Sequence, residues 1–310
     1  MIIMSNDFIR LVSGKSRFCR EIELWTRTPD GRFRLYKAAG LDWRPPRGGE
    51  SQQPQLFIKR EDSAKVSERS ELFFYDQLHS CLNGGEPEKV KGALINFMEA
   101  ILDEPRVGNL MLTAIVIEAM VAHCYEDPSI IANLTRISNS DVSTAVHSVG
   151  VMSFALGFCL FTGHSEEETR QLGLASLLHD VGKTRVPQEV LNAPRQLSAN
   201  EMQKIREHVN LGQEILASGG PITRNITPIT LEHHEKLDGS GYPNGTSKIS
   251  HSGQVMTMID IYEALTNKRP YRAALQPFEA LWTIKKEVQM GQLNREIFKS
   301  LELSLAPNIP

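Results

Sequence analysis

An adjacent histidine and aspartate near the middle of the chain could bind a metal ion. His179 and Asp180 follow an apolar run, Leu172 to Leu178, that is typical of a buried helix. Burying an imidazole and a carboxylate costs free energy unless something pairs with them, and a metal ion accepts both as ligands. Gly182 is expected to let the backbone turn, and Lys183 places a cation beside the pair. A solvated polar helix end would explain the same residues, so the pair alone does not decide.

Other histidines in the chain extend this pattern. Of nine histidines, five lie where predicted helices end or present apolar faces: His147, His179, His208, His233 and His234. Any one of them alone is more often a structural histidine than a ligand. Together with Asp180, and with Asp260 inside an apolar helical segment, they offer seven ligands. That number suits two metal ions that share a bridging carboxylate.

A glycine-rich segment from Asp238 to Gly245 directly follows the two adjacent histidines. It is not a dinucleotide-binding fingerprint, because it follows a helix, lacks the required glycine spacing and opens no immediate helix. A surface turn would explain its glycine, proline and asparagine residues. It would not explain why the turn adjoins His233 and His234.

A cationic segment follows the predicted Asp260 helix, with Lys268, Arg269, Tyr271 and Arg272 close together. Arginine can donate two hydrogen bonds to a phosphate diester, and tyrosine can stack or hydrogen-bond. A run of charge is usually only a solvated face. Its closeness to Asp260 in the sequence favours phosphate binding here.

The composition limits the class of protein. The 310 residues are 41% hydrophobic and 23% charged, which is ordinary for a soluble globular protein of one or two domains. The net charge of -3 argues against a general surface for polymeric nucleic acid or membranes. The longest apolar stretches, Leu110–Ala122 and Val149–Thr162, are shorter than the roughly 18–20 residues of a membrane span, so core helices are expected. Four separated cysteines and no visible signal peptide predict a cytoplasmic protein with reduced thiols.

The secondary-structure signals change at about residue 85. Residues 1–85 predict a small α/β module, with strands Phe18–Thr26, Phe33–Lys37 and Gln55–Lys59 and a helix Ser63–Leu82. Residues 86–310 predict an all-α domain. Its expected helices are Pro87–Leu102, Pro105–Tyr125, Asp141–Thr162, Ser165 to His179, Ser198 to Leu216, Ile222–Glu235, Ser250–Leu265, Pro277–Met290 and Asn294–Leu303, with capping boxes at Ser165 and Ser198.

The ordered motifs resemble the HD-GYP domains, a branch of the HD metal-dependent phosphohydrolases. The resemblance covers roughly residues 130–280. It rests on His147-Ser148, Leu177 to Lys183, His208 with Gly212, His233-His234-Glu235, Asp238 to Pro243, Asp260 to Thr266, and Arg269 to Arg272. It implies an all-α domain that hydrolyses cyclic di-GMP, a bacterial second messenger, to linear pGpG or GMP.

The resemblance also implies roles for single residues. One metal would be held by His147, His179, Asp180 and Asp260, and the other by His208, His233 and His234, with Asp180 bridging. Lys183, Arg269 and Arg272 would contact substrate phosphate, with Tyr242 in a loop beside the site. A hydroxide activated by two ions, iron or manganese, would attack phosphorus in line with the departing ribose oxygen, and Lys183 is a candidate proton donor to that oxygen.

Two departures from the family pattern keep alternatives open. Some relatives hold a third metal with a glutamate four residues before the first histidine, where this chain has Ser143, so two metals are expected. The family commonly has arginine three residues after that histidine, where this chain has Gly150, which is expected to weaken helix packing or substrate affinity. The alternatives are a degenerate domain that binds cyclic di-GMP or a protein partner, through the Gly-Tyr-Pro loop or the N-terminal module, and a hydrolase for another nucleotide.

Overall fold

The computed structural model describes residues 7–11, 15–42, 55–84, 86–103, 105, 107–136, 143–191, 193, 195–268 and 272–306. The chain divides into two compact units, Met1–Phe73 and Phe74–Pro310. The division falls inside helix α1 (Ser63–Gly84), which the sequence predicted almost to its ends. The functional boundary near residue 85 remains a prediction.

The first unit contains a four-stranded antiparallel sheet. Its strands are β1 (Phe8–Arg10), β2 (Leu24–Arg27), β3 (Phe33–Lys37) and β4 (Leu56–Lys59), in the order β1-β4-β2-β3. The predicted hairpin is confirmed, because β2 and β3 pair and Gly31 between them has a left-handed φ of 83°. The predicted start of the first hairpin strand at Phe18 was wrong, since Lys15–Phe18 form a 3-10 helix. Strand β1 was not predicted.

The core of this unit lies between the sheet and the start of α1. It consists of Leu11, Cys19, Ile22, Leu24, Ile58 and Val66. Every member is apolar or a small thiol, so burial of hydrophobic surface is what stabilises the unit.

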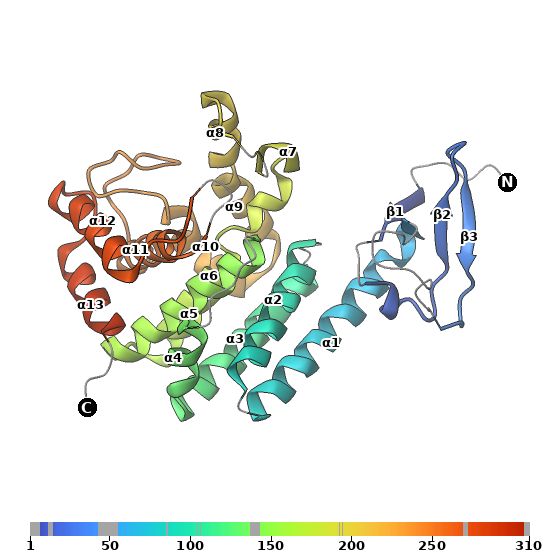
Figure 1. The fold of residues 1–310 in the computed structure, drawn as a ribbon, viewed down its shortest axis with the longest axis horizontal. Helices are drawn as coiled ribbons and strands as arrows, with labels where there is room; N and C mark the ends of the chain where they lie inside the picture. The colour runs from blue at the N-terminus through green and yellow to red at the C-terminus, as the bar shows by residue number, and fades with distance from the viewer. Residues whose placement is uncertain are drawn as a thin grey trace. The chain divides into compact units, whose positions relative to one another are not determined.

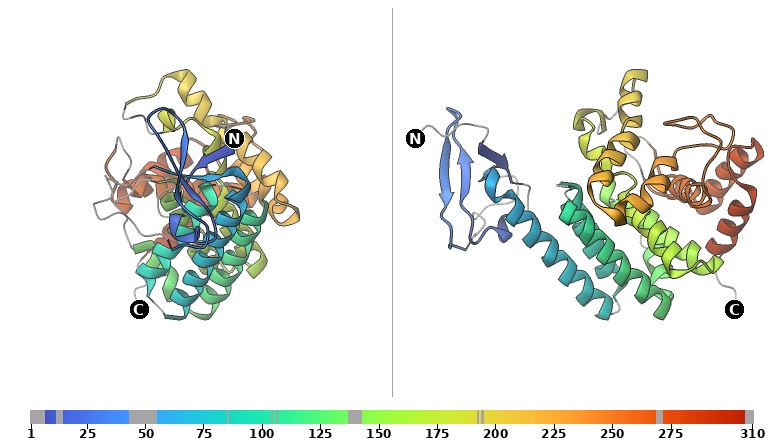
Figure 2. Two further views of the ribbon diagram at one scale, coloured as in Figure 1. Left: turned by 90° about the vertical axis from the view of Figure 1, so that its right-hand side faces the viewer. Right: turned by 180° about the vertical axis from the view of Figure 1, so that it is seen from behind.

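The second unit is all-helical, as predicted (Figure 1). Its elements are α2 (Pro87–Asp103), α3 (Val107–Glu126), α4 (Ser129–Arg136), α5 (Thr144–Thr162), α6 (Glu166–Leu178), the 3-10 helix η5 (Val181–Arg185), α7 (Gln188–Leu191), α8 (Ala199–Arg206), α9 (His208–Ser218), α10 (Pro221–Glu232), α11 (His251–Thr266), α12 (Pro277–Gln289) and α13 (Arg295–Leu305). Three of these, α4, α7 and η5, were not predicted. The single helix expected from Ser198 to Leu216 is two helices, α8 and α9, and α8 projects from the rest of the unit (Figures 1 and 2).

Helix α5 is the centre of the helical unit. It packs against α2, α4, α6, α11 and α13. Among the described residues it is the one helix long and apolar enough to cross a membrane, but most of it is buried inside the protein. The apolar stretch of α3 is also buried at Leu110, Val116 and Met120. Both stretches therefore form core helices, as expected.

Helix starts are fixed by side-chain caps. Ser165 and Ser198 each form the predicted capping box, with Glu168 and Glu201 respectively. The Ser143 hydroxyl accepts a hydrogen bond from the Val146 amide at 3.2 Å, so it caps α5. This cap sets the helical register of the residues in the first turn of α5.

Candidate metal centre

The predicted ligands lie at the ends of helices, where side chains can turn toward a shared point. His179 is the C-cap of α6, and Asp180 follows it. His208 begins α9, because the helix is interrupted at Glu207 and α8 does not continue. His233 and His234 follow the last residue of α10. His147 in the first turn of α5 and Asp260 within α11 complete the set.

Gly182 brings two of these helix ends into contact. A Cβ atom on Gly182 would lie 1.9 Å from the His208 carbonyl oxygen and 2.5 Å from the Gly212 amide nitrogen. Only glycine permits this approach between η5 and α9. Its role is therefore close packing, and not the turn that the sequence suggested. The contact places Asp180 Oδ1 3.2 Å from His208 Nε2.

Three histidines share one orientation. The Nδ1 atoms of His179, His208 and His233 each donate to a backbone carbonyl three residues earlier. These bonds are to Ser176 at 2.8 Å, Ile205 at 2.6 Å and Thr230 at 2.5 Å. A carbonyl only accepts hydrogen bonds, so each Nδ1 carries a proton and the Nε2 atom of each ring is turned away from that carbonyl.

The Nε2 atoms converge in two places. The Nε2 atoms of His147 and His179 lie 3.3 Å apart, and those of His208 and His233 lie 3.4 Å apart. With His234 and Asp180 they form two clusters of potential ligands. One is His147, His179 and Asp180, and the other is His208, His233 and His234, with the ligand atoms of each within 4.8 Å of one another. Facing imidazole nitrogens of this kind suit divalent metal ions.

Asp180 lies between the two clusters and is almost fully buried. Its Oδ2 is ion-paired with the Lys183 ammonium and lies 3.4 Å from His179 Nε2. Its Oδ1 makes no hydrogen bond within the described part of the chain, although His208 Nε2 lies 3.2 Å away. Burial raises the pKa of this carboxyl, but Lys183 and His179 outweigh burial and hold the pKa well below its usual range. A buried anionic oxygen beside an imidazole nitrogen is a position that a cation would satisfy.

His147 has a different environment from the other histidines. Its Nε2 lies 3.0 Å from Asp260 Oδ1, and its Nδ1 contacts the buried Glu263 carboxylate. Burial lowers the pKa of His147, but the two carboxylates outweigh burial and raise the pKa to about 9. The surroundings of the ring therefore favour positive charge, which a bound metal cation would supply.

Two rings of the second cluster, those of His233 and His234, have lowered pKa values. Burial, together with the neighbouring imidazoles, holds the pKa of His233 well below its usual range. Burial likewise lowers the pKa of His234 to about 3, against the opposing effect of Asp260. Neutral imidazoles are the form that binds metals, so these rings are ready ligands at neutral pH.

The loop between α10 and α11 lies against the second cluster. The Tyr242 amide donates to the His234 carbonyl at 3.1 Å, and the two rings stack with centroids 4.6 Å apart. The guanidinium of Arg206, at the end of α8, lies 5.0 Å from the Tyr242 ring centroid. A Cβ atom on Gly241 would lie 2.5 Å from the backbone at His234, so glycine is required there. Tyr242 therefore lies between a candidate ligand and a cation.

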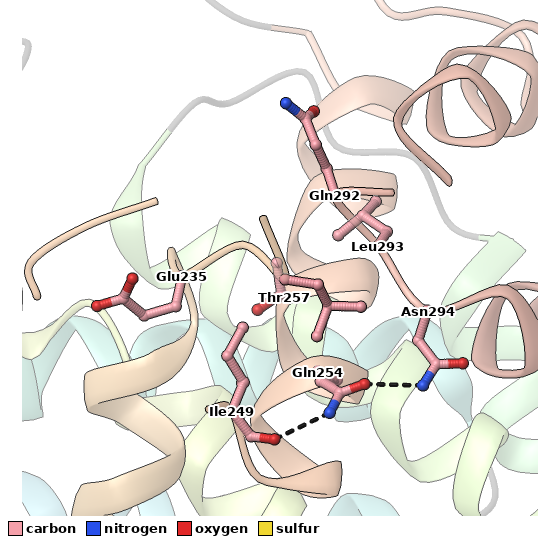
Figure 3. A pocket seen from close by; sticks show the side chains of 8 residues that line it. Glu235, Ile249, Gln254, Thr257, Gln292, Leu293 and Asn294 are labelled. Carbon is pink, nitrogen blue, oxygen red and sulfur yellow. Dashed lines mark hydrogen bonds between the residues drawn. The ribbon is translucent and has the colours of Figure 1, made fainter. Parts of the chain in front are cut away.

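Glu235 holds this loop in place. Its buried carboxylate accepts hydrogen bonds from the Asn244 amide at 2.7 Å and the Thr246 amide at 3.1 Å. It also lines a small pocket in which Asn294 donates to Gln254 at 2.8 Å (Figure 3). The empty space at the pocket, part of it open to solvent, is about 180 Å³, less than the roughly 300 Å³ of the smallest usual ligand pockets. It is part of the support of the loop rather than a nucleotide site.

Comparison with known proteins now decides the family. The HD domain family matches residues 126–297, more than half of the chain. The chain belongs to the HD domain family. It is 30% identical over 198 residues to a cyclic di-GMP phosphodiesterase of Pseudomonas aeruginosa, covering 62% of this chain and 47% of that protein. It is 36% identical over 155 residues to the cyclic di-GMP phosphodiesterase response regulator RpfG of Xanthomonas campestris pv. campestris, covering 48% of this chain and 37% of the relative.

A solved structure supports the same fold. An HDG"Y"P protein from Bdellovibrio bacteriovorus superposes with a TM-score of 0.62 at 15% identity, covering 97% of this chain and all of the other. The predicted mainly α fold is thereby confirmed, and the HD domain match together with the relatives named as cyclic di-GMP phosphodiesterases supports the predicted HD-GYP membership. The chain spans about half the length, or less, of the curated relatives that it matches.

The proposed phosphate ligands of this HD domain are only partly described. Lys183 lies at the centre, paired with Asp180. Arg272 is half-buried and donates to the carbonyl of Ala264, in the last turn of α11. Arg269 and Tyr271 lie outside the described residues.

Three residues at the site of this HD domain were missed as functional candidates. Glu263 lies one helical turn after Asp260 in an apolar helix, and that spacing on one face was a signal. Glu235 adjoins His234 but was quoted only as part of a motif. Arg206 had no signal, because only the fold brings it over Tyr242.

Proposed function

We propose that the HD domain of this chain is a metal-dependent phosphodiesterase that hydrolyses cyclic di-GMP to pGpG or GMP. The observation that carries the proposal is the convergence of imidazole Nε2 atoms around Asp180, a buried carboxylate whose Oδ1 makes no hydrogen bond among the described residues. Names of the relatives supply the substrate class, since several act on cyclic dinucleotides.

The ligand assignment follows from the two clusters. His147, His179, Asp180 and Asp260 would hold one divalent ion, and His208, His233 and His234 would hold the other, with Asp180 shared. Iron and manganese suit this mixture of imidazole and carboxylate. Two bound ions would supply Lewis-acid stabilisation of phosphoryl oxygens and an activated water for attack.

Other side chains of the protein would bind the substrate and transfer a proton. Lys183 is ion-paired with Asp180 at the centre, and we assign it contact with a phosphoryl oxygen and proton donation to the leaving ribose oxygen. Arg269 and Arg272 would bind the phosphates by paired hydrogen bonds. Tyr242 keeps one face of His234 covered, and we assign it a substrate contact at the edge of the site.

The remaining assignments follow from this activity. We assign the enzyme to the cytoplasm, and the N-terminal module, taken as residues 1–85, to regulation or to binding of a protein partner. One further substrate class is favoured by a specific observation. The chain is 33% identical over 164 residues to a 3'3'-cGAMP-specific phosphodiesterase of Vibrio cholerae.

The test is turnover by protein loaded with iron or manganese under anaerobic conditions. Cyclic di-GMP and 3'3'-cGAMP are assayed in parallel, with Asp180→Ala as the inactive variant and Ser165→Ala, a helix cap remote in function, as the control. We expect pGpG or GMP from the wild type and the control, and none from Asp180→Ala. Tight binding without product would instead identify a binding domain, and turnover of cGAMP alone would change the substrate.

A further inference from the structure

We infer that Glu263 is a positioning residue that aims His147 at the metal, and that Gly150 provides the space it occupies. The inference rests on the proposed metal centre. Glu263 is 1% exposed in α11, and its Oε2 contacts His147 Nδ1 across 116 residues of sequence. We distinguish its role from that of the proposed ligands, because Glu263 contacts the outer nitrogen of the ligand His147.

The contact sets the orientation of the ring. A carboxylate only accepts hydrogen bonds, so His147 Nδ1 carries the shared proton and Nε2 faces Asp260 and His179. The other Glu263 oxygen, Oε1, accepts from the Asn267 side-chain amide at 2.9 Å, which holds the carboxylate in place. His179, His208 and His233 obtain the same orientation from backbone carbonyls, so His147 is the ligand oriented by a charged side chain.

Gly150 makes this arrangement possible. It lies one turn after His147 on α5, and a Cβ atom there would lie 2.4 Å from Glu263 Oε1 and 3.0 Å from Cγ and Cδ. Any side chain at position 150 must therefore displace the carboxylate. The space left by glycine at this departure from the family pattern is thus filled by the buried Glu263 carboxylate. The expected effect of Gly150 on helix packing or substrate affinity stays a prediction.

A charged partner should strengthen metal binding at His147. A carboxylate bonded to the outer nitrogen of a ligand imidazole fixes its tautomer and raises its basicity, and losing such a partner typically costs about 10–100-fold in metal affinity. The loss should fall on one of the two ions, because the second cluster contains no residue bonded to Glu263.

The experiment measures metal affinity by chelator competition in the full chain. Glu263→Ala and Gly150→Ala should each weaken one of two metal equivalents by about 10–100-fold, and Glu263→Gln should weaken it less because its amide oxygen still accepts. The double variant Gly150→Ala with Glu263→Ala should bind metal no more weakly than Glu263→Ala alone, because Glu263→Ala has already removed the contact with His147. Gly157→Ala is the matched control on the same helix, where an added Cβ would meet Ile131 at 3.0 Å instead.

A spectroscopic readout separates positioning from packing. In protein loaded with Co²⁺, the exchangeable Nδ1 proton of His147 should give a strongly shifted proton resonance that moves in Glu263→Gln and stays unchanged in Gly157→Ala. Unchanged affinity and an unchanged resonance in folded Glu263→Gln and Glu263→Ala would overturn this inference while leaving the metal centre intact. Wild-type protein that binds no metal would overturn the proposed function and the inference with it.

Discussion

The two histidine clusters use the same side chain in opposite electrostatic settings. In the first, Asp260 and Glu263 raise the pKa of His147 to about 9, so the site already attracts positive charge. In the second, burial first, and then the neighbouring rings, lower the pKa values of His233 and His234. Carboxylates therefore dominate the surroundings of His147 in the first cluster, whereas burial dominates the surroundings of His233 and His234 in the second.

Helix α11 causes this difference. It contributes both Asp260 and Glu263, one turn apart, to the first cluster. The second cluster is built from α9 and the end of α10, and carboxylate oxygens approach it at two points: Asp180 Oδ1 lies 3.2 Å from His208 Nε2, and Asp260 Oδ2 lies 3.9 Å from His234 Nδ1. Asp180 makes the shorter of these two approaches, and we propose it as the ligand that the two metals share.

The largest predicted effect follows from removing that shared residue. Asp180→Ala should abolish retention of both metals and lower cyclic di-GMP turnover by more than the roughly 10²–10³-fold lost with a single transition-state hydrogen bond. Metal analysis and a turnover assay check this. Retention of both metals would show that the clusters bind independently.

A second prediction breaks the contact that joins the clusters. Gly182→Ala should lower the free energy of unfolding by about 1–3 kcal/mol or more, because the added Cβ meets the His208 carbonyl at 1.9 Å, and it should weaken the second metal first. Gly92→Ala is the control, since an added Cβ there meets nothing within 4 Å. Denaturant unfolding of both variants measures the difference, and equal stability would contradict the packing described.

A third prediction sharpens the contrast in charge. During titration with a chelator, the all-histidine cluster should release its metal first, with an affinity lower by about tenfold or more, or about 1.4 kcal/mol. The variant His208→Ala should lack the weaker equivalent and keep the stronger. Simultaneous release of both metals would mean that the difference in charge between the clusters does not change their metal affinities.

The smallest predicted effect concerns the loop beside the second cluster. Tyr242→Ala removes the ring stacked on His234 and should cost about 0.5–1.5 kcal/mol, seen as a rise in KM or a modest loss of kcat. Tyr242→Phe keeps the ring and should behave nearly as the wild type. Kinetics of the two variants distinguish stacking from hydrogen bonding, because equal losses would assign the effect to the hydroxyl group.

Local signals in the sequence predicted much of this molecule. The capping boxes at Ser165 and Ser198 marked helix starts correctly, because a cap depends on residues three apart. The cluster members were predicted by motif, and the fold brings them together. The break before His208 was missed, because the capping box at Ser198 and the apolar residues after it fit one continuous helix equally well.

Contacts between residues far apart in the chain could not be predicted from the sequence. Nothing local to Gly150 shows that its missing side chain makes room for Glu263, which lies on another helix. Gly182 likewise looked like a turn residue, and only its approach to the His208 backbone shows that it is a packing residue. Glycines at helix contacts are ambiguous in sequence because their function depends on what lies opposite.

The most direct test of the account is metal analysis of freshly purified, full-length protein, compared with Asp180→Ala. The account predicts two equivalents of a divalent metal per chain in the wild type and less than one in the variant. Three equivalents would contradict the argument from Ser143, whose hydroxyl caps α5. No bound metal in a correctly folded wild type would contradict the central claim that the two clusters form a metal centre.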